Sequence, residues 1–268
     1  MERAGRPGEP RAREQVAWGR RWPEFIRTRG RGSALLALNV VLFALFVRLR
    51  ALSAVVGMPI HYAYPVAVDR WLTFGHEPIS WLQHHLLPAS GLGAADFLLV
   101  AVYVTYFVAP PVMAILLWWR RSPRLGPFTL AVFGVLYLGL VVNLLVPTAP
   151  PWMAAALGYI PAIHRGVPEV LDFFVHGLFS TGDRMAGAND VAAMPSLHMA
   201  VATVVAVFLP RPRRLPFLPA VLYAGLMGLA LMTLGEHFLV DVLAGLALAL
   251  AVCAVVLHPP LHRHRAAG

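Results

Sequence analysis

The sequence contains one cysteine, no lysine and few charged residues of any kind. Of its 268 residues, 13% are charged and 59% are hydrophobic, and the mean hydropathy is +0.67. Cys253 lies in an apolar run, and a single cysteine excludes an intrachain disulfide, a CxxC redox pair and a cysteine-based zinc site. Because a soluble domain needs a larger share of charged residues on its surface, the composition also excludes a soluble protein.

Acidic residues are scarce as well, and long stretches between them carry no carboxylate. The chain has 13 acidic residues against 22 arginines, which gives a net charge of +9. Nine of these arginines and four glutamates lie in residues 1–32, a local charge of +5. The positive charge flanks apolar runs and is not interleaved with aromatic residues, so we expect an anionic lipid surface and no nucleic acid as the partner.

Six apolar segments are long enough, or nearly so, to cross a bilayer as helices. A hydrocarbon core of about 30 Å requires about 20 helical residues. The sequence therefore predicts an all-α integral membrane protein with six transmembrane helices. A membrane catalytic domain at residues 33–257 follows a basic arm at 1–32 and precedes a tail at 258–268. The predicted spans are residues 33–57, 97–119, 128–146, 194–209, 218–234 and 238–257.

Arginines in the short connections predict the orientation of these helices. With six spans, all four basic segments fall on one side, which the positive-inside rule assigns to the cytoplasm. We therefore expect a multi-pass cell-membrane protein with both termini in the cytoplasm. Arg48 and Arg50 disagree, because they come late in the first span; either that helix ends earlier or they serve a polar cavity. The basic segments are residues 1–32, 120–124, 211–214 and 262–265.

The long connections at 58–96 and 148–193 then lie outside, where their Pro, Trp and His content predicts ordered structure. We expect interfacial helices near Trp71 and at 81–87. The run Pro-Thr-Ala-Pro-Pro-Trp at 147–152 directly follows the third span. By itself this run also fits a rigid helix stop with an interfacial tryptophan, since proline prevents helix continuation.

A second motif, Met-Pro-Ser-Leu-His at 194–198, opens the fourth predicted span on the same outer side. Pro195 suits a first helical turn, where free backbone N–H groups form an anion site. His198 lies one turn inside an apolar helix and is costly there without a partner. A buried structural histidine and a functional histidine both fit this position.

The third motif places His237 four residues before Asp241, at the start of the sixth span. Asp241 is the only acidic residue well inside any predicted span, where an aspartate costs about 2.5 to 3.5 kcal/mol. On a helix, the two side chains lie on one face. The carboxylate can then accept a proton from one imidazole nitrogen and leave the other as a nucleophile or base. A purely structural His–Asp pair fits the same spacing.

Together the three motifs, with Gly245 after the third, resemble the type-2 phosphatidic acid phosphatase superfamily. The closest resemblance is to its branch related to fungal inositol phosphorylceramide synthase, and it covers roughly residues 97–257. It implies a six-helix membrane fold and phosphoryl transfer through a phosphohistidine, without a metal or another cofactor. It further implies His237 as the nucleophile, Asp241 as the residue that orients it, and His198 as the acid and base. Ser196 and the N–H groups that open the fourth span would hold phosphate oxygens.

The sequence departs from the commoner family pattern in its basic residues. That pattern has a lysine and an arginine in the first motif and an arginine six residues before the nucleophile. Here residues 143–152 contain no basic residue, and position 231 is Leu231. Because phosphate oxygens need positive charge, we expect Arg184 and Arg165 to supply it, with Arg48 and Arg50 as the next candidates.

Three other residues near the motifs are candidates for contacts at the site. Asn143 and Thr148 belong to the first motif and are predicted to bind substrate. Glu236 would repel a phosphate dianion, so we expect its side chain to contact an arginine or an acceptor, or to point away.

Three functions fit these observations. A lipid-phosphate phosphatase acting outside the cytoplasm is favoured. A phosphotransferase that moves a phosphoryl head group between a phosphorylated lipid and a polyol such as inositol is the enzymatic alternative, and an inactive lipid-binding or transport protein is the third. A metal site made of His198, His237 and Asp241 and a hydrolase that uses Ser196 are less favoured.

Overall fold

The computed structural model describes residues 11–53, 56–187, 189–210 and 217–258, and in these ranges the side chains from residue 30 onward except those of residues 52 and 53. Within these ranges the chain forms helices and no β-strand. The all-α membrane class is confirmed. The basic turn at 211–214 and the basic tail at 262–265, which the predicted orientation uses, lie outside the described residues.

Each of the six predicted apolar segments forms a helix, but the helices differ in length. Four are long and apolar enough to cross a membrane, while α9 has 12 residues and α10 has 16. The number of six spans therefore stays a prediction. The six helices are α1 (Arg11–Ser53), α4 (Ala94–Trp119), α5 (Leu125–Leu145), α9 (Leu197–Phe208), α10 (Leu218–Thr233) and α11 (Leu239–Leu257).

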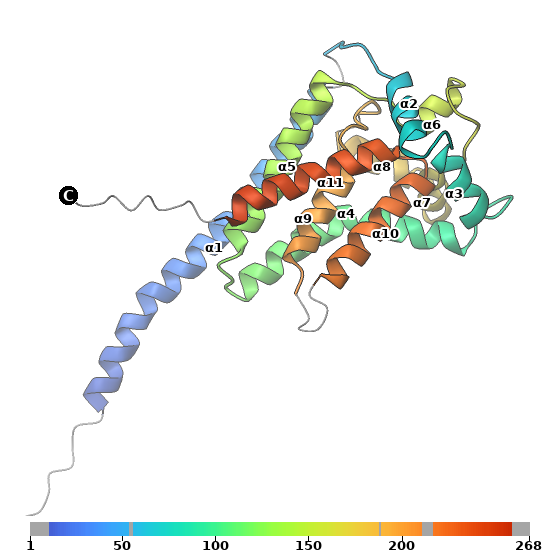
Figure 1. The fold of residues 1–268 in the computed structure, drawn as a ribbon. Helices are drawn as coiled ribbons and strands as arrows, with labels where there is room; N and C mark the ends of the chain where they lie inside the picture. The colour runs from blue at the N-terminus through green and yellow to red at the C-terminus, as the bar shows by residue number, and fades with distance from the viewer. Residues whose placement is uncertain (1–10, 54–55, 188, 211–216, 259–268) are drawn as a thin grey trace, which may run out of the picture.

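The short helix α9 occupies the centre of the bundle and contacts α4, α5, α10 and α11. Because it is apolar all round and enclosed by neighbours, ten of its residues are buried. Helix α1 packs on α5, where Asn39 donates to Thr129 at 2.9 Å and Tyr137 donates to the Leu42 carbonyl at 2.9 Å. Figure 1 shows α1 continuing well beyond the bundle at one end.

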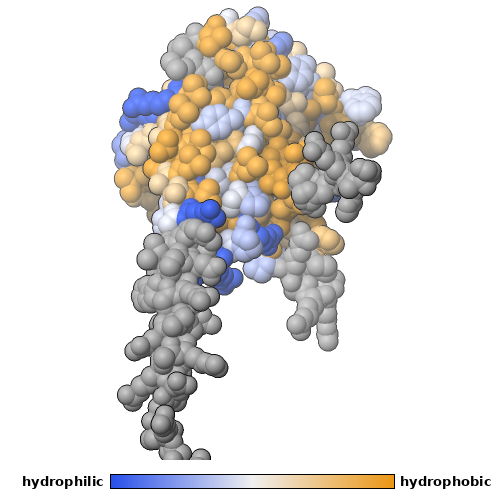
Figure 2. All heavy atoms as spheres, turned by 90° about the vertical axis from the view of Figure 1, so that its left-hand side faces the viewer, coloured by the Kyte–Doolittle hydropathy of each residue, from blue (hydrophilic) through white to orange (hydrophobic). Residues whose placement is uncertain are grey.

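The outward faces of the long helices are apolar. Val40 on α1, Leu98 on α4 and Leu130 on α5 are each more than 60% exposed. Figure 2 shows a face of the molecule on which hydrophobic residues predominate. A protein in water would not expose so much apolar surface, whereas a bilayer covers it at no such cost.

Five short helices fill the two long connections, as their composition predicted. Helix α2 includes Trp71, and α3 includes the predicted segment at 81–87 up to residue 86. Helices α2, α3 and α6 gather at one end of the bundle (Figure 1). Backbone hydrogen bonds join His61, Thr148 and the segment around Ala192 side by side at this end. The helices are α2 (Ala63–Leu72), α3 (Pro78–Leu86), α6 (Pro151–Ala156), α7 (Gly166–Phe174) and α8 (Leu178–Met185).

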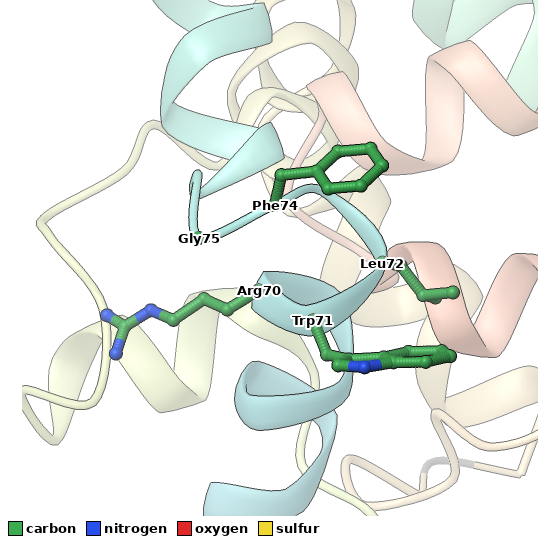
Figure 3. Close-up of a pocket in the computed structure, with 5 residues that line it drawn as sticks. All are labelled: Arg70, Trp71, Leu72, Phe74 and Gly75. Carbon is green, nitrogen blue, oxygen red and sulfur yellow. The ribbon is translucent and has the colours of Figure 1, made fainter.

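An open hollow of about 650 Å³ lies at the end of α2. Figure 3 shows its lining, which includes the exposed rings of Trp71 and Phe74. It contains none of the residues that the sequence predicts for the site, which lie near the end of α5, at the start of α9 and α11, and in the connection at 148–193.

Candidate functional site

His237 lies in the tight turn between α10 and α11. The backbone N–H groups of Glu236 and His237 both donate to the Leu231 carbonyl, at 3.0 and 3.2 Å. Gly235 has a φ of 73°, a conformation that glycine adopts without strain. Leu231, at the position where the family pattern has an arginine, is fully buried. It therefore contributes its backbone and its packing, and no charge, to the turn.

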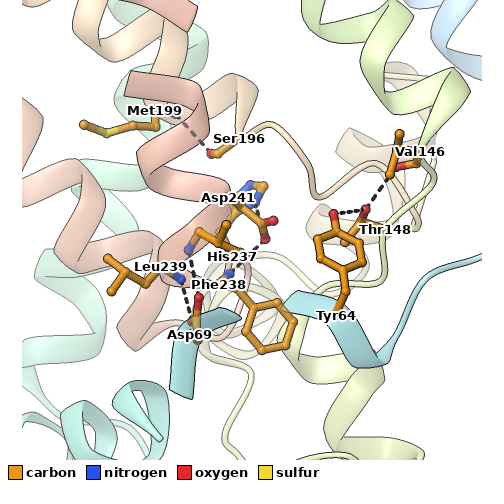
Figure 4. A network of polar contacts seen from close by, with 11 residues as sticks. Tyr64, Asp69, Val146, Thr148, Ser196, Met199, His237, Phe238, Leu239 and Asp241 are labelled. Carbon is orange, nitrogen blue, oxygen red and sulfur yellow. Dashed lines mark hydrogen bonds and ion pairs between the residues drawn. The ribbon is translucent and has the colours of Figure 1, made fainter. Parts of the chain in front are cut away.

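Asp241 lies beside His237, although not as the helical spacing predicted. Helix α11 begins at Leu239, so His237 precedes the helix and Asp241 is in its first turn. The imidazole Nδ1 is 3.7 Å from Asp241 Oδ2, which also accepts the Phe238 N–H at 3.0 Å. The buried carboxylate thus caps its own helix as well as facing the imidazole (Figure 4).

His198 comes to the same place from α9. Its ring centroid is 5.7 Å from that of His237. The His198 ring also packs on Tyr103 and Tyr106 of α4, at centroid distances of 4.5 and 4.1 Å. Its Nε2 has no hydrogen-bond partner among the described residues. The structure therefore brings the three predicted catalytic residues together, and leaves this imidazole nitrogen available.

Ser196 joins α9 to α11 next to these histidines. Its hydroxyl accepts the Met199 N–H at 3.2 Å as the N-cap of α9, and its own N–H donates to the Asp241 carbonyl at 3.0 Å (Figure 4). The prediction that Pro195 lies in the first helical turn is wrong, because α9 begins at Leu197 and Pro195 precedes the helix. A Cβ on Gly245 would overlap the Ser196 carbonyl oxygen, so glycine permits this close approach.

The first motif supplies one satisfied and one unsatisfied polar side chain. The Thr148 hydroxyl is fully buried, accepts from Tyr64 at 2.7 Å and donates to the Val146 carbonyl at 2.9 Å (Figure 4). Asn143 is also buried, but neither its amide oxygen nor its amide nitrogen has a hydrogen-bond partner in the described chain. Thr148 therefore holds the outer segments together, whereas Asn143 retains its hydrogen-bonding capacity.

Arg165 lies beside the turn that contains His237 and forms an ion pair with Glu236. Its Nε donates to Glu236 Oε1 at 3.0 Å, and its guanidinium lies over the rings of Trp152 and Phe179. Burial raises the pKa of the Glu236 carboxyl, and the charge of Arg165 opposes that rise. The expectation that Glu236 contacts an arginine is confirmed. The backbone N–H of Trp152 also donates to the Gly235 carbonyl at 3.2 Å. Trp152 therefore connects the first motif to the site.

Arg184 is exposed on α8 and donates to Thr181 at 3.2 Å. Burial raises the pKa of the neighbouring Asp183 carboxyl, and the charges of Arg50, Arg165 and Arg184 oppose that rise. The three arginines are therefore close enough to act on one carboxylate. Arg184 has no hydrogen bond to the His237 turn in the structure, so its contact with substrate stays a prediction.

Arg50 reaches from α1 into the second outer connection. It donates to the backbone carbonyls of Ala186 at 3.1 Å, Gly187 at 2.6 Å and Asn189 at 3.4 Å. Arg48 is exposed. Of the two arginines that disagreed with the charge pattern, Arg50 thus fixes the segment that leads to α9.

Two residues at the site did not emerge from the sequence. Asp69 on α2 is buried and accepts the Leu239 and Val240 N–H groups, each at 2.8 Å. Gln83 on α3 donates to the His164 and Thr233 carbonyls at 2.7 and 2.8 Å, and so connects the Arg165 segment to the end of α10. These contacts join side chains to backbone groups at least 81 positions away, which no local motif can reveal. The one sequence feature that could have pointed to Asp69 is its carboxylate in a mostly apolar helix of ten residues.

Possible metal ligands are dispersed. In the ranges that the structure describes, no three His, Cys, Asp or Glu side chains are grouped closely enough to hold a metal ion.

Comparison with known proteins gives a family match and two similar enzymes. Residues 63–255 match the PAP2 superfamily. The chain is 31% identical over 162 residues to the inositol phosphorylceramide synthase catalytic subunit aur1 of Schizosaccharomyces pombe, covering 57% of this chain and 37% of that protein. It is 29% identical over 167 residues to the phosphoinositol dihydroceramide synthase of Bacteroides thetaiotaomicron, covering 58% of this chain and 53% of that protein.

The chain thus covers 37% to 53% of the length of these relatives. No solved structure matches it. The family match runs from the start of α2 to residue 255 in α11 and contains all three motifs; it begins earlier than the resemblance at 97–257 and does not include α1. The chain therefore belongs to the PAP2 superfamily.

Proposed function

We propose that the protein cleaves a phosphorylated membrane lipid through a phosphohistidine formed at His237. The position of His237 between Asp241 and His198 carries this proposal. The 3.7 Å contact with Asp241 occupies the Nδ1 side of the imidazole, so Nε2 is the nitrogen that attacks. The rings of His237 and His198 are 5.7 Å apart, a spacing at which both can reach one phosphoryl group.

The reaction proceeds in two displacements. In the first, His237 Nε2 bonds to phosphorus, the bond from phosphorus to the leaving oxygen breaks, and His198 gives that oxygen a proton. In the second, His198 takes a proton from the acceptor hydroxyl, whose oxygen bonds to phosphorus as the phosphorus–nitrogen bond breaks. Asp241 stabilises the positive charge that the His237 ring acquires while it carries the phosphoryl group.

Positive charge for the phosphate oxygens comes from the arginines next to the turn. Arg165 is the best placed, because its partner Glu236 immediately precedes His237. At the start of α9 the Ser196 hydroxyl takes up the Met199 N–H, so the N–H groups that precede it are the ones that would favour an anion. Arg184, Asn143 and Ser196 are the further candidate substrate contacts, and the reaction needs no metal or cofactor.

The acceptor in the second displacement decides the class of enzyme. With water, the protein is a lipid-phosphate phosphatase that acts on the extracytoplasmic side. With a polyol such as inositol, it is a phosphotransferase. A specific observation favours this second candidate: both relatives described above are named as synthases of inositol-phosphate sphingolipids. Closure of the outer segments against water would select the alcohol.

Purified protein offered lipid phosphates, with and without inositol or glycerol, tests the proposal. We expect release of inorganic phosphate with water as the acceptor, and formation of a polyol phosphate together with the dephosphorylated lipid when a polyol is the acceptor. His237→Ala should abolish both products, and Asp241→Asn should slow them by about a hundredfold or more. His198→Ala should be least harmful with an aryl phosphate, whose leaving group needs no proton. Full turnover by folded His237→Ala protein would refute the mechanism, and loss of activity with a chelator would support the metal site instead.

A further inference from the structure

The start of α11 has an acceptor for each backbone N–H group from 237 to 240. The His237 N–H donates to the Leu231 carbonyl, and the Phe238 N–H donates to Asp241. The next two N–H groups, of Leu239 and Val240, donate to the two oxygens of Asp69 (Figure 4). A helix start normally leaves such groups for water or a ligand. Here one carboxylate from a distant helix takes up two of them.

This arrangement also settles where an anion can bind. The N-terminus of a helix attracts phosphate, and α11 carries His237 next to its N-terminus. A phosphate at that position would displace Asp69 or meet its negative charge. The phosphate oxygens must therefore be held by other groups, and the N-terminal turn of α11 serves to fix His237.

We infer that Asp69 is a positioning residue, which aligns His237 with His198 by anchoring the first turn of α11 to α2. This inference rests on the proposed function for its catalytic consequence. Asp69 is 2% exposed, so its carboxylate is retained in a buried place only because it is hydrogen-bonded. Its two contacts lie two and three residues from His237, so a shift of α2 or of the carboxylate is transmitted to the imidazole through a few bonds.

Glu77 provides a matched control. It caps α3 in the same manner, accepting the Ile79 N–H at 3.1 Å and the Ser80 N–H at 2.6 Å. Glu77→Gln and Asp69→Asn each replace a helix-capping carboxylate by its amide, but only Asp69 contacts the helix next to His237. A purely structural role would make the two variants alike in turnover and in melting temperature.

Leu239→Pro tests the same contact from the other side and keeps the inference testable if Asp69→Asn does not fold. Proline at the first position of a helix is well tolerated, and it removes the N–H that donates to Asp69. Phe238, the preceding residue, has a φ of −71° and a ψ of 160°, which a following proline allows.

The closing experiment measures turnover, melting temperature and the rate at which diethylpyrocarbonate modifies His237, followed by mass spectrometry. We expect Asp69→Asn to lower kcat by about tenfold to a hundredfold with KM changed less than about threefold, as for a misplaced catalytic group. In the same variant, diethylpyrocarbonate should modify His237 several times faster than in wild type. Leu239→Pro should show a smaller change in the same direction, Asp69→Glu should recover part of the loss, and Glu77→Gln should equal wild type in kcat and in His237 modification.

The two possible failures are distinguishable. Wild-type kcat and wild-type His237 modification in both Asp69→Asn and Leu239→Pro would overturn the inference, even if His237→Ala is inactive. Conversely, altered His237 modification in Asp69→Asn, together with full activity of His237→Ala, would uphold the positioning role and refute the proposed function.

Discussion

At the scale of single residues, the Arg165–Glu236 pair is expected to affect both the stability of the fold and turnover. Arg165→Gln leaves Glu236, whose side chain is 11% exposed, without its partner. We expect the free energy of unfolding to fall by about 1 to 3 kcal/mol, the usual cost of an unsatisfied buried group. The double variant Arg165→Gln/Glu236→Gln should recover most of that stability but not the turnover. Thermal melting and a lipid-phosphate assay measure the two effects, and recovery of both would show that Arg165 has no role in catalysis.

A second prediction concerns pH and Asp69. Burial raises the pKa of this carboxyl from 3.8 to about 6, against the effect of its hydrogen bonds from Val240 and Leu239, while Asp241 and Glu77 raise it further. Between these pH values the folded protein binds a proton that the unfolded chain does not. The folded state is therefore favoured at low pH, and we expect about 3 kcal/mol of this stabilisation to be lost as the pH rises through 6.

Melting temperatures of wild type and Asp69→Asn between pH 4 and 7 test this prediction. Glu236 and Asp183 also have raised pKa values and affect both proteins, so the difference between the two curves isolates Asp69. We expect wild type to lose more stability than Asp69→Asn over this range. Two parallel curves would contradict the raised pKa.

Sequence patterns located the catalytic candidates because each belongs to a short motif. His237, Asp241 and His198 are recognisable from local spacing, and the structure brings them together. The geometry of the His237–Asp241 pair was not predictable. The spacing of four residues fits a continuous helix, whereas α11 begins only after Phe238. The role of Asp69 was not predicted for a different reason. Its partners are backbone N–H groups 170 and 171 positions away, and every residue type except proline has such a group, so no sequence pattern marks them.

At the scale of helices, the contact between α9 and α11 depends on Gly245. A methyl group there would overlap the Ser196 carbonyl oxygen, so Gly245→Ala must separate α9, which carries His198, from α11, which follows the His237 turn. We expect turnover to fall by about tenfold or more, since small misplacements of catalytic groups are costly. Gly225→Ala on α10 is the control, because its Cβ would meet nothing within 4 Å and alanine favours helix. Equal activity of the two variants would show that the close contact is not needed.

The apolar segments predicted the bounds of the main helices to within a few residues, except that α1 begins already at Arg11, and whether α9 and α10 cross the membrane stays a prediction. Helix α9 is enclosed by four neighbours, and α10 packs on α3, α4, α9 and α11. A helix surrounded by protein can be shorter than the bilayer, because neighbouring elements complete the crossing. Hydropathy alone does not contain this information, since it records composition and not contacts.

At the scale of the whole molecule, the arginine pattern predicts that the His237 site faces outside the cytoplasm. Pro123 lies in the basic turn between α4 and α5, whereas Tyr159 lies in the second outer connection, and both are exposed. With Cys253 replaced by alanine, a single cysteine at Tyr159 should react with an impermeant thiol reagent in intact cells. A cysteine at Pro123 should react only after permeabilisation. The reverse pattern would place the site in the cytoplasm.

The central claim is that His237 itself carries the phosphoryl group, and rapid quenching with a phosphorus-labelled lipid substrate tests it most directly. We expect an acid-labile, alkali-stable label that forms within one turnover and maps to His237. In Asp241→Asn the label should form more slowly, and in His237→Ala it should be absent. A label on another residue, or steady turnover of wild type without any labelled protein, would contradict the account.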